Sequence, residues 1–182
     1  MPSQRRSLLL LILIGGIGVL GSYILAFVYE PAIRAGLWGG IPESLQGFYT
    51  INMLLAAASF FPITYVLGFK TSFESFREQT GFSFEAMLGA YAAILMPSAL
   101  WLPLTAFYIQ GTAAGEPSVA LWWLIRIVLF LVGGGASLLA AMLIRRASHG
   151  PSWIWLAAVA FFFFWLQTMV LDAIVWPYFY HA

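Results

Sequence analysis

Long apolar runs separated by short polar stretches dominate the sequence. Five runs are long enough to cross a bilayer, because a helix needs about 20 apolar residues to span its hydrocarbon core. They are apolar on every face and do not alternate with polar residues as the strands of a membrane barrel would. We therefore predict an all-α polytopic membrane protein, a bundle of five transmembrane helices formed by residues 1–182 as one domain. The predicted spans are residues 8–29, 48–69, 84–109, 119–144 and 153–176.

Composition points to the same class of protein. The chain is 62% hydrophobic and only 8% charged, whereas a soluble domain carries about 25% charged residues. We therefore expect a lipid bilayer as its solvent. The net charge of +1 gives no basis for nucleic-acid binding, which needs a basic patch.

The sequence offers little catalytic or metal-binding chemistry. It contains no Cys, which excludes disulfides, thiolate metal sites and a thiol nucleophile. Its two His, His149 and His181, lie outside the apolar runs, so we predict no metal site within the membrane. No HExxH or GxSxG motif occurs. The sequence thus does not favour an enzyme, and it names no cofactor.

The basic residues predict an orientation. Arg5 and Arg6 precede the first run, as in a signal peptide, but this run exceeds the usual 7–15 apolar residues and no A-x-A site follows. We therefore expect it to remain as a helix. Cytoplasmic loops carry an excess of Lys and Arg, and only Arg34 would lie outside if the N-terminus is cytoplasmic. We predict a multi-pass protein of the plasma or inner membrane, with its N-terminus cytoplasmic and its C-terminus outside. The predicted inner residues are Arg5, Arg6, Lys70, Arg77, Arg145 and Arg146.

Two loops carry structural signals. In residues 70–81, Thr71 and Glu74 have the spacing of a capping box and Gly81 ends the stretch, which predicts a short interfacial helix. That helix could also dock a cytoplasmic partner. Residues 30–47 contain Pro and Gly in both halves, and we expect them to cap the outer end of the bundle or to act as a lid.

Small residues and prolines shape the expected packing. Helices in lipid associate by close contact at small residues, and such residues occur in three of the spans. Pro97 and Pro103 interrupt the 84–109 span, where each removes a backbone donor. A doubly kinked helix can leave a cavity beside it. The expected packing seams comprise Gly15, Gly18, Gly21, Ala56–Ser59 and Gly133–Ser137.

Two ionisable residues lie well within the spans. Arg126 lies about two turns below the outer end of the 119–144 span, and Asp172 about one turn below the outer end of the 153–176 span. An unpaired charge in the membrane costs roughly 2.5–3.5 kcal/mol on insertion scales. We therefore expect Arg126 and Asp172 to pair, either to set helix register or to serve a function.

Other polar and aromatic residues reach the same depth. Asn52 lies about one turn below the outer end of its span, and Thr168 shares a helix face with Asp172 at a spacing of four. Trp122 could stack on the guanidinium of Arg126, and Glu30 could lie at the rim. The predicted ligand-binding site contains Asn52, Trp101, Tyr108, Trp122, Arg126, Thr168 and Asp172.

Three functions remain open. The protein could bind a small amphipathic ligand or lipid in an outer aromatic cavity, where Arg126 would orient an anionic or carbonyl group. It could be an assembly subunit that contacts a membrane partner or a second copy. It could also be a small transporter that uses the Arg126–Asp172 pair.

One resemblance favours the ligand-binding hypothesis. A five-helix, tryptophan-rich chain with "WLP" at Trp101–Pro103 resembles the tryptophan-rich sensory proteins of the TspO translocator type. The first loop reads "LWGGIPES" and departs from the Trp-Asn-Pro-Pro-like stretch of that family. The resemblance implies porphyrin or sterol-like ligands.

Overall fold

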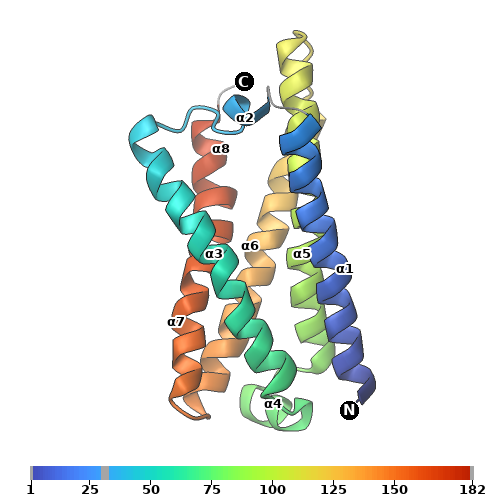
Figure 1. The fold of residues 1–182 in the computed structure, drawn as a ribbon, viewed down its shortest axis with the longest axis vertical. Coiled ribbons are helices and arrows are strands. Elements are labelled where there is room, and N and C mark those ends of the chain that lie inside the picture. The colour runs from blue at the N-terminus through green and yellow to red at the C-terminus, as the bar shows by residue number, and fades with distance from the viewer. Residues whose placement is uncertain (1, 30–32, 181–182) are drawn as a thin grey trace.

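The computed structural model describes residues 2–29 and 33–180, and every regular element within them is helical (Figure 1). Five helical stretches are long and apolar enough to cross a membrane, which confirms the number of predicted spans. The last stretch is continuous through α7, η1 and α8. The elements in chain order are α1 (Pro2–Tyr29), α2 (Ile33–Gly36), α3 (Glu43–Phe69), α4 (Phe73–Thr80), α5 (Phe84–Ala113), α6 (Val119–Ser148), α7 (Trp153–Trp165), η1 (Leu166–Val175) and α8 (Trp176–Phe179).

Serine caps set where two long helices begin. The Ser83 hydroxyl accepts a hydrogen bond from the Ala86 amide at the start of α5, and Ser118 accepts from Leu121 at the start of α6. Each cap satisfies a backbone donor that the first helical turn leaves free. Neither Pro97 nor Pro103 ends α5, so the prolines do not divide this span.

The expected interfacial helix forms as α4, but its cap differs from the prediction. Ser72 is the N-cap and accepts from the Ser75 amide at 3.2 Å. The Thr71 hydroxyl instead donates to the carbonyl of Val66, at the end of α3. Gly81 ends α4 in the left-handed conformation, with φ of 75°. A capping box starting at Thr71 was therefore wrong by one residue.

The five spans do not pack in chain order. Helix α5 lies between α1 and α6, and α6 packs in turn against α7 and η1. Helix α3 packs mainly against α7 and crosses the bundle diagonally, so that it approaches α1 only at the lower end of Figure 1. At the upper end α1 and α3 are separated in this view.

Small residues lie at close helix contacts in two of the expected packing seams, those of Gly15 and of Gly133–Ser137. A Cβ added at Gly15 would lie 2.7 Å from Leu95 of α5, and one added at Gly135 would lie 2.9 Å from the Ala90 carbonyl. Gly133 approaches Met169 of η1 in the same way. Gly21 meets no neighbour within 4 Å, so its expected role in a packing seam was wrong within the described residues.

The buried apolar residues form two clusters at opposite ends of the bundle. The lower core is the larger cluster and is mostly aliphatic, whereas the upper core is smaller and has a larger share of aromatic residues. The lower core comprises Leu8, Ile63, Val66, Leu67, Phe73, Phe76, Phe84, Met87, Ala90, Tyr91, Ile94, Leu95, Val132, Ala136, Leu139, Met142, Leu143, Ala147, Ile154, Ala157 and Phe161. The upper core comprises Ile41, Tyr49, Tyr108, Ile125, Leu129, Leu171, Ala173 and Trp176.

The connection between α1 and α3 folds over the upper end of the bundle (Figure 1). The Trp176 indole donates a 2.8 Å hydrogen bond to the Leu37 carbonyl, and Ile41 is buried in the upper core. Gly39 has a φ of 55°, and a Cβ there would clash with the Tyr180 ring. The described part of this loop therefore caps the bundle, as predicted.

Candidate functional site

The last span changes its helical geometry where its polar residues lie. From Leu166 to Val175 the backbone forms a π-helix, in which each amide bonds the carbonyl five residues earlier. In an α-helix, residues five apart differ by about 140° around the axis. The wider π-turn brings them nearly above one another. Gln167 and Asp172 therefore share a face only because this segment is a π-helix.

Three side chains form a hydrogen-bonded polar chain between α3 and η1. The Gln167 amide donates to Asp172 Oδ1 at 2.7 Å, and Asn52 donates to Gln167 Oε1 at 3.0 Å. The Asn52 amide is also within 3.2 Å of the Phe163 carbonyl. Asn52 and Gln167 are buried, whereas Asp172 keeps part of its surface accessible. We call these residues the Asn52–Gln167–Asp172 chain.

Asp172 has few partners for an intramembrane carboxylate. No described residue donates a hydrogen bond to its second oxygen, Oδ2. The Tyr49 hydroxyl of α3 donates to the carbonyl of Leu171, the residue before Asp172. The carboxylate therefore lies on a stretch of η1 that α3 contacts, and part of it remains available to a further donor.

Aromatic rings extend from this carboxylate to the upper end of the bundle. Trp101 makes edge contacts with Tyr23 and with Trp176, at centroid distances of 6.4 Å and 6.3 Å. Trp122 continues the series and stacks on Tyr180 at 5.2 Å. These rings form the upper aromatic cluster, which comprises Tyr23, Trp101, Tyr108, Trp122, Trp176 and Tyr180.

Tyr180 lies at the outer limit of this cluster, beyond the last span. Burial, with a smaller effect of Tyr108, raises the pKa of Tyr180 to about 12. Its hydroxyl is therefore neutral at physiological pH and can donate a hydrogen bond.

The predicted Arg126–Asp172 ion pair does not form. Among residues 2–29 and 33–180, no Lys or Arg nitrogen lies within 4.0 Å of a carboxylate oxygen. The Arg126 guanidinium instead lies over the Trp123 ring, 4.8 Å from its centroid. Its Nε is buried without a hydrogen-bond partner in the described chain. A long side chain can reach an aromatic surface at the interface, so equal depth did not bring the two charges together.

Other predicted site residues divide into two groups. Asn52 joins Asp172 through Gln167, and Trp101, Tyr108 and Trp122 meet in the upper aromatic cluster. Thr168 does not contribute its hydroxyl, because it donates to the Phe164 carbonyl of its own helix. The structure thus brings four of the predicted residues into two neighbouring groups and turns Arg126 and Thr168 to other contacts, and ligand binding by them stays a prediction. Glu30, the expected rim residue, lies outside the described residues.

Sequence reasoning missed Gln167, Tyr49, Tyr23 and Trp176. The first of these had a signal, since Gln is rare in an apolar span. Residues that share a face of an α-helix are three, four or seven apart, whereas Gln167 lies five residues from Asp172. Tyr23 and Tyr49 come from spans distant in the sequence, and only the helix arrangement places Tyr49 against η1 and Tyr23 against Trp101.

The fold and the site define a class of protein. The chain is a polytopic α-helical membrane protein by the length and composition of its five candidate spans, with one carboxylate in a polar and aromatic site. Among the residues described, no group of three or more His, Cys, Asp or Glu could hold a metal ion. No known protein family, curated protein or solved structure matches this chain.

Proposed function

We propose that this protein is a non-catalytic membrane receptor for a small amphipathic ligand, which binds between Asp172 and the upper aromatic cluster. Asp172 carries the proposal. An intramembrane carboxylate costs roughly 2.5–3.5 kcal/mol on insertion scales, and here a single amide donates to it. A ligand that donates a hydrogen bond to Oδ2, or brings a cation, would offset that cost.

The neighbouring residues suggest the shape of the ligand. The edge-on rings of Tyr23, Trp101 and Trp176 suit a flat apolar body, because aromatic side chains bury large areas with defined geometry. Its polar group would be an amine, hydroxyl or ring N–H. This reverses the expectation from Arg126, which would have selected an anionic or carbonyl group.

Photolabelling tests this proposal directly. The purified protein would be reconstituted in phosphatidylcholine nanodiscs and labelled with a diazirine probe that carries a flat apolar body and an amine. A carboxylate probe of the same shape provides the comparison. We expect the amine probe to label η1 and the Trp101 region, and to do so more strongly than the carboxylate probe.

Two variants sharpen the photolabelling experiment. Asp172→Asn should reduce labelling by the amine probe about tenfold, because a charge-assisted hydrogen bond becomes a neutral one. Arg126→Gln removes a charge of the same upper half outside the site, and labelling should be unchanged. Labelling confined to lipid-exposed positions such as Leu156 and Val159, or equal loss in both variants, would contradict the proposal.

A second candidate function, an assembly subunit, rests on α1. This helix is the least buried of the five candidate spans, with 11% of its most apolar window buried. A partner or a second copy could cover that face. Purification in mild detergent separates the two hypotheses, since a stoichiometric membrane partner favours assembly and a monodisperse single chain favours the receptor. The transporter hypothesis required an ion pair between Arg126 and Asp172, and this pair does not form.

We also propose that the lower end of the bundle faces the cytoplasm. Six Lys or Arg residues of the loops and chain start belong to this end, and Arg34 belongs to the other. An excess of basic residues in short loops sets topology. A reporter fused to the C-terminus should therefore be active outside; a cytoplasmic signal would reverse the orientation.

A further inference from the structure

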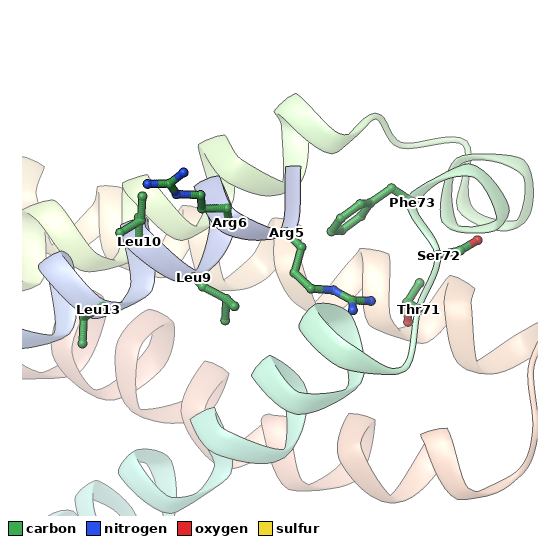
Figure 2. Close-up of a pocket in the computed structure, with 8 residues that line it drawn as sticks. All are labelled: Arg5, Arg6, Leu9, Leu10, Leu13, Thr71, Ser72 and Phe73. Carbon is green, nitrogen blue, oxygen red and sulfur yellow. The ribbon is translucent and has the colours of Figure 1, made fainter. Parts of the chain in front are cut away.

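A groove opens at the lower end of the bundle, between the start of α1 and the α3–α4 connection (Figure 2). Its volume is about 660 Å³. Leu9, Leu10 and Leu13 line it along α1, and the Phe73 ring faces it from α4. One wall is therefore aliphatic over about one helical turn.

Two arginines border the same groove. Figure 2 shows the Arg5 guanidinium extending toward Thr71 and the Arg6 guanidinium extending along α1 beside Leu10. Both side chains are exposed, and no carboxylate of the described chain lies within 4.0 Å of either. Arg5 makes only a distant contact with Phe69, 6.0 Å from the ring centroid.

We propose that this groove binds one anionic phospholipid. The exposed side chains of Arg5 and Arg6 extend apart in Figure 2 and would turn toward the phosphate on binding, because guanidinium groups pair with phosphate through two parallel hydrogen bonds. An acyl chain would follow Leu9, Leu10 and Leu13 into the bilayer. Basic pockets beside membrane helices bind anionic lipid headgroups in this way.

The arrangement of charge and apolar surface favours a lipid over a soluble anion. Leu13 is seven residues from Arg6, about two helical turns or 10 Å along α1. The ligand must therefore present a negative group at one end and an apolar chain beside it. Inorganic phosphate would use only the two arginines and leave the leucine wall uncovered.

Native mass spectrometry of the full chain tests the proposal. Dioleoyl phosphatidylglycerol, dioleoyl phosphatidylcholine and glycerol 3-phosphate would be added separately to the delipidated protein. We expect one phosphatidylglycerol to be retained at least about fivefold more than phosphatidylcholine, and glycerol 3-phosphate not to be retained. Equal retention of the two lipids, or retention of glycerol 3-phosphate alone, would overturn the proposal.

Charge variants distinguish binding in the groove from general attraction of anionic lipid to the basic residues at this end of the bundle. Arg5→Gln/Arg6→Gln should abolish the preference for phosphatidylglycerol, because each basic side chain near an anionic surface contributes roughly 1 kcal/mol, or about fivefold. Lys70→Gln/Arg77→Gln removes the same charge from exposed positions outside the groove and should keep the preference. An equal loss in both variants would show diffuse attraction and overturn the site.

Removal of Arg5 and Arg6 could change the orientation of the protein in the membrane, because basic residues set topology. A variant that fills the groove and keeps both arginines avoids this effect. Leu9→Trp places a bulky ring against the wall and should displace the phosphatidylglycerol. Ile14→Trp is the matched control, because Ile14 is 67% exposed on the same helix and does not line the groove. Retention in Leu9→Trp, or equal loss in both, would show that the lipid binds elsewhere.

Discussion

The lower and upper cores of the bundle hold the apolar helices together by different kinds of contact. The lower core is built mainly from Leu, Ile, Met and Ala, and close backbone approach at Gly15 and Gly135 brings its helices together. The upper core combines aromatic rings with the Asn52–Gln167–Asp172 chain and a π-helix. Dense packing fixes one helix arrangement, whereas polar groups and an irregular helix cost stability and are frequent at functional sites.

The largest expected effect lies in the lower core. Leu139→Ala should lower the free energy of unfolding in mixed micelles by about 2–5 kcal/mol, because a fully buried side chain leaves a cavity and loses its contacts. Leu138→Ala, at a position 36% exposed, should have little effect. Equal losses at Leu138 and Leu139 would contradict the assignment of this helix face.

A smaller loss is expected from closing the seam between α5 and α6. Gly135→Ala places a methyl group 2.9 Å from the Ala90 carbonyl, which is backbone and cannot rotate away. Overpacking of this kind costs about 1–3 kcal/mol, measured by the same unfolding assay. The adjacent Gly134 meets nothing within 4 Å, so Gly134→Ala should leave stability unchanged; a loss there would argue against the helix register.

The Asn52–Gln167–Asp172 chain should contribute less to stability than the packing at Leu139 or at Gly135. Asn52→Leu removes two hydrogen bonds and leaves Gln167 Oε1 without its donor. Interhelical hydrogen bonds in membranes contribute about 0.6 kcal/mol on average and up to about 1.7. We expect a loss of about 1 kcal/mol together with weaker photolabelling at η1. A loss as large as that of Leu139→Ala would make this chain a main source of stability.

The smallest expected effect concerns Arg126. Arg126→Leu removes the stacking on Trp123, worth about 0.5–1 kcal/mol, and also removes a charge from the span. These effects oppose each other, so the midpoint of thermal unfolding should change little. A large destabilisation would mean that the guanidinium has a partner in the upper half, and the functional distinction between Arg126 and Asp172 would then fail.

The comparison also shows which parts of the site could be predicted. Asp172 and Asn52 are recognisable in the sequence, because polar residues in apolar spans are rare and costly. Their mutual link was not recognisable, because Gln167 bridges them through a spacing that an α-helix does not support. Arg126 was predicted to contact Asp172 from a similar depth, and this contact was wrong, because depth fixes height along the bundle and not the direction around each helix.

The sequence by itself determined the class of fold and some of the helix ends, such as the starts at Phe84 and Val119, whereas other helices extend beyond the predicted spans. Apolar runs of about 20 residues must place their backbone hydrogen bonds within one segment in lipid, and local signals such as Ser83, Ser118 and Gly81 act within a few residues. Only the tertiary structure decided the order of helices around the bundle, the π-helical turn from Leu166 to Val175, and the hydrogen bonds from Tyr49 and Asn52 of α3 to this turn. These features depend on contacts between spans that are distant in the sequence, and the free energies of such contacts cannot be read from any one apolar run.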